Sequence, residues 1–184
     1  LAHLMNASLG NAGRTVHYVE PVEAEPVDEM RSLRDLVADM NRGVVDVLVI
    51  VGGNPVFTAP RDIAFGDALS RVARRVHLSQ FDDETSALCD WHIPEAHYLE
   101  AWGDTRAFDG TTTIVQPLIA PLYKSKSAYE LVAMLTSRPE RSGHDIVRHY
   151  WRSRFTGEGF DEHWEQSLND GFIAGTASAP KQVA

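Results

Sequence analysis

The sequence predicts an α/β domain whose sheet is mainly parallel. Short runs of β-branched residues alternate with segments of helical apolar spacing, as they do in β-α-β units. The run Val47–Val51 holds five consecutive apolar residues without polar alternation, which is typical of a central strand buried on both faces. Glycines and a proline follow it, so the chain must turn at the carboxyl end of this strand.

The first half of the chain predicts repeated strand–helix units. Residues 15–19 form a β-type run, and residues 32–41 carry apolar residues at i, i+3, i+4 and i+7 after a capping serine. The strand Val47–Val51 follows, and a helix over residues 63–73 leads into a strand at residues 76–79. We expect the strands at 16–19, 47–51 and 76–79 to lie in one parallel sheet.

This arrangement predicts three layers, with helices on both faces of the sheet. Leu48 and Ile50 should point into one core layer, and the three valines of the same strand should point into the other. Residues 91–93 are a candidate for a further short strand, which Pro94 ends.

The second half of the chain predicts a long connection followed by helices. Residues 95–126 are rich in Gly, Thr, Asp and Pro, which is typical of a loop that carries function or packs on a partner. A capping box at Ser127 begins one helix, and residues 142–155 form another. We therefore expect an α/β domain over residues 1–137, and a helical extension with a flexible tail after Gly171 over residues 138–184.

Composition limits the classes of partner. The chain has 184 residues, 43% hydrophobic content and a formal charge of −9, which allows a full core and argues against nucleic acid. No apolar run approaches the ~18 residues of a membrane span, so we expect no direct membrane insertion. Cys89 is the single cysteine, which excludes an intrachain disulfide and a four-cysteine iron–sulfur cluster. Residues 1–6 resemble the middle of an amphipathic helix, so we expect a fragment of a longer protein.

One apolar stretch is unusual for a solvated loop. Residues 116–123 are mostly apolar, yet two prolines exclude a helix or a central strand there. We expect Trp102, Phe108 and residues 114–123 to form an exposed apolar face that the parent protein covers.

The sequence indicates no catalytic or metal-binding residue. His92 and His97 are five residues apart, as are His144 and His149, which separates each pair by about 140° on a helix. Ser86 lacks a Gly-x-Ser-x-Gly elbow, so it carries no signal for nucleophilic catalysis.

The turn Gly52, Gly53, Asn54 and Pro55 is the candidate binding loop, since ligands of open α/β sheets lie at the carboxyl ends of strands. It lacks the Gly-x-Gly-x-x-Gly pattern, which disfavours ordinary NAD binding, and a tight turn with Asn54 bonded to its own backbone is the alternative. Glycines allow close approach of a nucleotide, and Thr85 could cap a helical turn or meet a phosphate.

Three motifs occur in order: Gly-x-Asn-Pro after a strand, Thr-x-x-x-x-Asp-x-x-x-Pro some thirty residues later, and then Glu-x-x-Gly. The matching residues are Gly52, Asn54 and Pro55, then Thr85, Asp90 and Pro94, then Glu100 and Gly103. As a set they resemble the third, Rossmann-like domain of the molybdopterin oxidoreductase (dimethyl sulfoxide reductase) superfamily, over roughly residues 44–137. The resemblance implies that strand-end loops hold the nucleotide part of molybdopterin guanine dinucleotide. The cofactor-binding residues would be Gly52, Gly53, Asn54, Pro55, Thr85, Glu100 and Gly103.

The chain also departs from that superfamily, because the arginine of its usual Glu-Gly-Arg-x-Gln segment is missing. Residues 97–123 instead resemble the molybdopterin-oxidoreductase-like iron–sulfur subunit of bacterial alternative complex III, a quinol-oxidising respiratory assembly. This resemblance implies that the pterin cofactor is lost and that iron–sulfur clusters belong to another domain of the parent. It also implies other domains and subunits as partners, and a membrane-associated location on the periplasmic face, with no translocation signal in this segment.

Two main hypotheses follow. In the first, the chain is a structural scaffold domain of such a complex and is not catalytic by itself. In the second, it is the cofactor-binding domain of an active molybdenum bis-pterin guanine dinucleotide oxidoreductase. A free-standing nucleotide-binding module is a third and more remote alternative.

Overall fold

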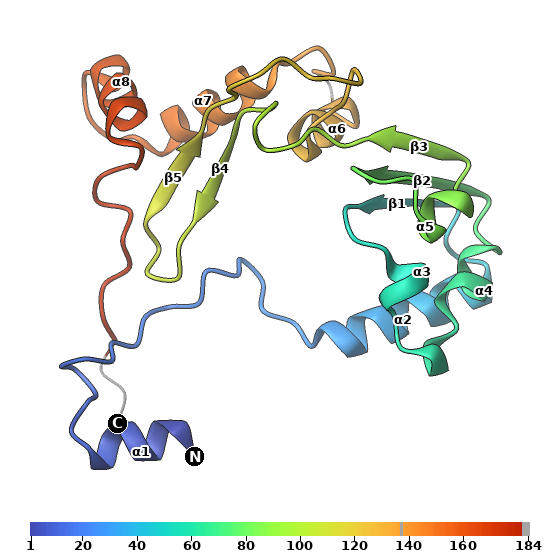
Figure 1. The fold of residues 1–184 in the computed structure, drawn as a ribbon, viewed down its shortest axis with the longest axis horizontal. Helices are drawn as coiled ribbons and strands as arrows, with labels where there is room; N and C mark the ends of the chain where they lie inside the picture. The colour runs from blue at the N-terminus through green and yellow to red at the C-terminus, as the bar shows by residue number, and fades with distance from the viewer. Residues whose placement is uncertain (137, 182–184) are drawn as a thin grey trace. The chain divides into compact units, whose positions relative to one another are not determined.

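A computed structural model describes residues 1–136 and 138–181 (Figure 1). The chain divides into two compact units. The sheet unit consists of Pro26–Gly103 and Gln116–Arg154, and the terminal unit consists of Leu1–Glu25, Asp104–Val115 and the described residues after Arg154. Residue 137, where the expected α/β domain ends, and residues 182–184 of the expected tail lie outside the described residues.

The sheet unit is built on three parallel strands. They are β1 (Val47–Val51), β2 (Arg74–Ser79) and β3 (Trp91–Pro94), in the order β1-β2-β3. In the register, Ile50 lies beside His77, and His77 lies beside His92. The α/β class and the parallel pairing of the first two of these strands are therefore confirmed.

The position predicted for β1 is wrong, because β1 lies at one edge of this sheet and β2 is central. Leu48 and Ile50 pack against the main core cluster, as predicted. Val47 and Val51, on the opposite face, are 57% and 48% exposed. An apolar run of this length predicts a strand, but it does not show how many strands or layers the described chain supplies around it.

The strand predicted at residues 16–19 is also wrong. Val16 and Tyr18 form only isolated bridges, with Ala12 and Lys181. The backbone amides of residues 14, 15 and 16 all donate to the carbonyl oxygen of Asn11. This tight turn uses the hydrogen bonds that a strand would have needed for a ladder.

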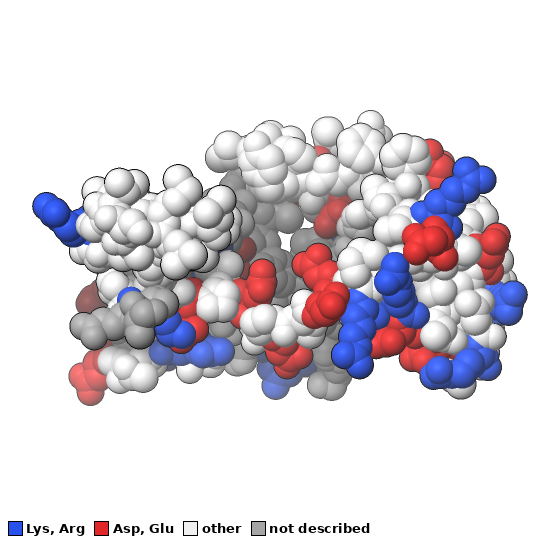
Figure 2. Space-filling model, turned by 90° about the horizontal axis from the view of Figure 1, so that it is seen from below, with Lys and Arg blue, Asp and Glu red and all other residues white. Residues whose placement is uncertain are grey.

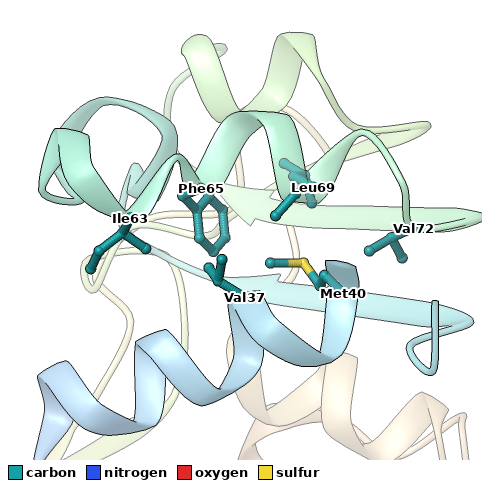
Figure 3. Packing of buried hydrophobic residues seen from close by; sticks show 7 residues of the cluster. Val37, Met40, Ile63, Phe65, Leu69 and Val72 are labelled. Carbon is teal, nitrogen blue, oxygen red and sulfur yellow. The ribbon is translucent and has the colours of Figure 1, made fainter. Parts of the chain in front are cut away.

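The main core lies between helices and one face of the sheet. Helix α2 (Glu29–Arg42) begins three residues before the predicted start, because Asp28 caps it by accepting from the amide of Arg31 at 3.0 Å. The predicted helix at 63–73 is shorter, with a 3-10 turn (Arg61–Ile63) leading into α4 (Phe65–Leu69). Figure 3 shows side chains of α2 and α4 pointing toward one another. The buried cluster is Val37, Met40, Ile63, Phe65, Ala68, Leu69 and Val72.

Two short helices follow the strands of the sheet unit, and two longer ones complete it. Helix α3 (Pro55–Thr58) follows β1, and α5 (Glu84–Ala87) follows β2. Helix α6 (Ala128–Met134) has the predicted capping box between Ser127 and Glu130, and α7 (Gly143–Arg154) contacts α6.

The terminal unit is held by a hairpin and the last helix. Strand β4 (Gly103–Arg106) pairs with β5 (Thr112–Val115), and α1 (Ala2–Ser8) and α8 (Phe160–Asp170) lie in the same unit. The disorder predicted after Gly171 is not seen at Ile173, which is buried and donates its amide to the Thr112 carbonyl at 2.8 Å. No helix in residues 1–136 or 138–181 has both the length and the apolarity of a membrane span.

The expected exposed apolar face is partly confirmed. Ile114 is buried in β5, and Trp102 is half-buried with its ring 4.8 Å from that of His144. Val115 is half-buried as well, and the remaining large apolar side chains of the set are exposed, namely Phe108, Leu118, Ile119, Leu122 and Tyr123.

Charges of both signs alternate along the outer side of α2. Figure 2 shows basic and acidic side chains next to one another in this region. Arg31 lies 3.9 Å from Asp35, and Arg34 lies 3.2 Å from Asp62. Opposite charges on this side of α2 therefore lie close enough to offset one another.

Truncating a side chain in the core should lower the stability of the protein more than truncating one on the exposed face of the sheet. Leu69→Ala removes a fully buried side chain and should lower the free energy of unfolding by about 2–5 kcal/mol. Val47→Ala, on the exposed face, should cost no more than about 1 kcal/mol. Urea unfolding at equilibrium measures both, and equal losses would contradict this placement of the core.

Candidate functional site

The chain turns sharply where β1 ends. Gly52 and Gly53 adopt φ angles of 65° and 67°, a region that L side chains rarely enter. The Gly52 amide donates to the carbonyl of Leu78 at 2.8 Å, so the parallel ladder continues one residue past β1. A Cβ added at Gly53 would meet no heavy atom within 4 Å, so this peptide stands at an open surface.

Asn54 links the loop after β1 to the loop after β2. Its Oδ1 accepts from the hydroxyl of Thr85 at 2.7 Å and from the amide of Phe57 at 3.4 Å. Its Nδ2 donates to Oε2 of Glu84 at 2.6 Å. Pro55 occupies the first turn of α3, where a missing N–H costs nothing. The predicted pair Asn54 and Thr85 is therefore brought together across 31 residues of sequence.

The side chain of Thr85, which bonds Asn54, is fully buried. Its hydroxyl donates to Asn54 and accepts from the amide of Val56 at 3.1 Å. Helix α5, which carries Thr85, is capped by Asp83, whose Oδ1 accepts from the amides of Thr85 and Ser86 at 3.0 Å each. Thr85 thus joins α3 to α5 and has both hydroxyl functions engaged.

A buried polar relay lies behind the loop, and the sequence did not reveal it. His77 is fully buried, with Nε2 3.0 Å from the Gly53 carbonyl and Nδ1 2.9 Å from Oγ of Ser86. Because a carbonyl only accepts, Nε2 of His77 donates to Gly53. The Ser86 hydroxyl also donates to the Phe81 carbonyl at 3.3 Å. Oγ of Ser86 also lies within hydrogen-bonding distance of Nδ1 of His92, at 2.7 Å. The only sequence signal for this relay was the presence of His77 and His92, which become neighbours when β2 pairs with β3.

The strand ends are acidic. Glu84 contacts Asn54, Asp83 caps α5, and Oε2 of Glu95 would lie 3.9 Å from a Cβ at Gly52. Desolvation raises the pKa of Glu95, and the nearby His77 offsets part of this rise. Among the described residues, none of these three carboxylates pairs with a lysine or an arginine. In residues 1–136 and 138–181, no three potential metal ligands gather in one place.

Asp90 of the second motif lies at the opposite end of the strands. It accepts from Nη2 of Arg75 at 2.7 Å through Oδ1, and from the Arg75 amide at 2.8 Å through Oδ2. The Asp90 amide donates back to the Arg75 carbonyl at 2.9 Å. Asp90 therefore fixes the start of β3 on the start of β2 and takes no part in the strand-end loop.

Glu100 and Gly103 are also separate from the loop. No hydrogen bond among the described residues joins either of them to Asn54 or Thr85. Glu100 accepts from the amide of Leu122 at 3.2 Å and from the hydroxyl of Ser125 at 3.0 Å. Desolvation raises the pKa of its carboxyl, but these bonds and one from the His97 amide outweigh it, so the pKa lies below its usual value. Gly103 begins β4, whose other residues belong to the terminal unit.

Removing the Thr85 hydroxyl should destabilise the loop. Thr85→Val keeps the shape but leaves Asn54 and the Val56 amide without their partner, so unfolding should be easier by about 1–3 kcal/mol. Thr58→Val is the matched control, because the exposed Thr58 hydroxyl bonds only the Asn54 carbonyl, and it should cost about 0.5 kcal/mol or less. Equal effects in thermal or urea unfolding would argue against a structural Thr85.

The Asp90–Arg75 pair should make stability depend on acid pH. The hydrogen bond from the Arg75 side chain holds the pKa of Asp90 below its ordinary value of 3.8. Its contribution is therefore complete above the unfolded pKa and is lost as the pH falls through the folded pKa. Wild-type protein should lose more stability than Asp90→Asn between about pH 5 and about pH 3. Parallel pH profiles of the two proteins would contradict this assignment.

No protein-family model matches the sequence. Over 92 residues the chain is 33% identical to the menaquinone reductase, molybdopterin-binding-like subunit of Nitratidesulfovibrio vulgaris strain Hildenborough. That match covers 48% of this chain and 13% of the relative. The fold is similar to that of acetylene hydratase from Pelobacter acetylenicus, with a TM-score of 0.60 and 17% sequence identity, over 82% of this chain and 21% of that one.

The chain spans only a small part of each of these two proteins. The sequence match and the shared fold agree with the spacing of the three motifs, of which Asn54 and Thr85 meet in space. On these grounds the chain is an α/β domain, and its sequence match and shared fold support the resemblance to the molybdopterin oxidoreductase superfamily.

Proposed function

We propose that this chain is a structural scaffold domain of a molybdopterin-oxidoreductase-like subunit in a quinone-linked, membrane-associated electron-transfer complex. The alternative complex III type is the specific assembly that we propose, with the domain on the periplasmic face. The relative from Nitratidesulfovibrio vulgaris is a subunit of a menaquinone reductase, which supports a quinone-linked context.

The observation that carries the scaffold proposal is the hydrogen bond between Asn54 and Thr85. Both side chains were expected to contact a nucleotide, yet each is bonded to protein groups. Asn54 engages Thr85, Phe57 and Glu84, and the Thr85 hydroxyl is buried with a donor and an acceptor in place. A nucleotide that bound here would have to break these hydrogen bonds, and the hydrogen bonds that it made in their place would be worth no more than those lost. As arranged, these residues do not fit the guanine dinucleotide.

The charges at the loop support the same conclusion. A guanine dinucleotide carries a diphosphate, which requires backbone amides, helix N-termini or basic side chains. Here Glu84 and Glu95 lie beside Asn54 and Gly52, and would repel a phosphate. The arginine typical of active superfamily members is also absent from its expected place.

One observation favours the alternative, a cofactor-binding domain of an active molybdenum oxidoreductase. Gly53 is open, with no atom within 4 Å of a hypothetical Cβ, so a ligand could approach its peptide. In that case Gly52, Gly53, Asn54 and Pro55 would hold the nucleotide, after Asn54 had exchanged its bond to Glu84 for one to the ligand.

Under either proposal the redox centres lie elsewhere in the parent protein. A four-cysteine cluster needs ligands that this chain lacks, since Cys89 is its only cysteine. Burial raises the pKa of the Cys89 thiol, which disfavours the thiolate that binds metals. We therefore propose that iron–sulfur clusters, where present, belong to another domain, and that this segment makes no catalytic contribution of its own.

Metal analysis of the parent polypeptide separates the two functions. The scaffold proposal predicts substoichiometric molybdenum and no pterin released on denaturation. One molybdenum per polypeptide, together with released pterin, would establish the enzyme instead.

Substitution of Asn54 gives a second test in the same protein. Asn54→Ala should lower the free energy of unfolding by about 0.5–1.5 kcal/mol for each hydrogen bond lost, and should leave the molybdenum content unchanged. Thr58→Val again serves as the control. A fall in molybdenum or pterin content with Asn54→Ala alone would contradict the scaffold.

A further inference from the structure

An exposed apolar segment lies in the connection between β3 and α6. Leu118, Leu122 and Tyr123 are 77%, 71% and 78% exposed, and Ile119 is 48% exposed. We call these four side chains the 118–123 surface. Scattered apolar residues are normal on a protein surface, but four large exposed ones within six residues of the chain, here called the strip, are a concentration typical of an interaction site.

This strip has a defined backbone. The amides of Leu118 and Ile119 both donate to the carbonyl of Leu99, at 2.8 and 3.1 Å. The amide of Leu122 and the hydroxyl of Ser125 donate to the two oxygens of Glu100. Because the segment is already ordered, a partner would not have to supply the free energy of ordering it.

Glu100 therefore holds the backbone of this segment in place through these two hydrogen bonds. The resemblance had assigned it to cofactor binding, but its carboxylate accepts bonds from residues on both sides of Lys124. Lys124 is held at a φ of 53°, which is unusual for a residue with a side chain. A fixed, strained loop next to exposed apolar side chains indicates that its conformation serves a contact.

A cavity of about 460 Å³ opens beside the strip. Trp102 and Pro121 supply apolar wall, and Lys124, Lys126 and Glu130 supply charge. Lys126 lies 3.4 Å from Glu130, so its charge is balanced. Lys124 has no ion-pair partner in the described part of the chain, which leaves one uncompensated cation at the edge of an apolar recess.

We propose that the 118–123 surface and this cavity dock another domain of the parent polypeptide, through an apolar face that inserts a side chain into the cavity and places a carboxylate opposite Lys124. The proposal rests on the proposed function, in which this chain is one domain of a larger subunit. The fold occurs within a much longer chain in acetylene hydratase, of which this chain covers 21%. The charge of Lys124 selects a carboxylate-bearing partner, although this chain is itself acidic overall.

Cysteine labelling of the parent polypeptide tests the docking. In a Cys89→Ser background, Tyr123→Cys places one thiol of this domain on the strip, and its maleimide labelling is compared with that of the urea-unfolded protein. Docking predicts labelling at least about tenfold slower in the folded parent, before any other subunit is added. Labelling as fast as in unfolded protein, before and after assembly, overturns the proposal. Protection that appears only on addition of another subunit, or only at concentrations at which the parent dimerises, also overturns it, because the occupant is then not a domain of the same polypeptide.

A charge reversal tests the role of Lys124. Lys124→Glu should speed labelling at position 123 severalfold, because it sets like charges against each other. The control Arg71→Glu makes the same charge change at an exposed position outside the cavity lining, and should have no effect. Equal effects of both reversals overturn the carboxylate assignment. Molybdenum content measured on the same samples reports on the scaffold proposal separately, since docking does not depend on whether the cofactor is present.

Discussion

The hydrogen bond between Asn54 and Thr85 determines how the carboxyl edge of the sheet is built. Parallel strands end on the same side, so the polar groups of their loops lie close together and must be satisfied. Here Asn54 and Thr85 satisfy one another, and the same contact joins α3 to α5. Behind them, His77 is hydrogen-bonded to Ser86 and donates to the Gly53 carbonyl, so the loop after β1 is bonded to the central strand. At this edge, Asn54 and Thr85 are therefore bonded to protein groups, while the Gly53 peptide stays open.

The opposite edge of the sheet is fixed in a comparable way. Asp90 accepts from both the side chain and the backbone of Arg75, which sets the start of β3 against the start of β2. Register in a parallel sheet is otherwise specified by burial alone, since a slip of one residue reverses every side chain. Because β2 is bonded at both of its ends, His77 is held next to His92. Ser86 is therefore held within hydrogen-bonding distance of both rings.

Local patterns predicted the strands of this unit and singled out Asn54 and Thr85, but they predicted neither the hydrogen bond between these two residues nor what surrounds them. The apolar run Val47–Val51 indicated a strand correctly, while its edge position depends on how many strands the rest of the chain supplies. Residues 16–19 have strand propensity, yet Asn11 draws their neighbours into a turn. Glu84 and His77 reach the loop after β1 through the β1–β2 register, which no short motif encodes.

The motif residues have structural roles that do not require a cofactor. Asn54 caps α3, Thr85 supports both short helices, Asp90 fixes β3, and Glu100 orders the segment around Lys124. Replacing any of them would leave a donor or an acceptor of its neighbours unpaired, and that cost persists whether or not a nucleotide is bound. A domain that lost its cofactor would therefore keep most of this motif set for folding alone. The arginine that the superfamily pattern places near the cofactor has no such structural partner to keep it, and this sequence lacks it at the expected place.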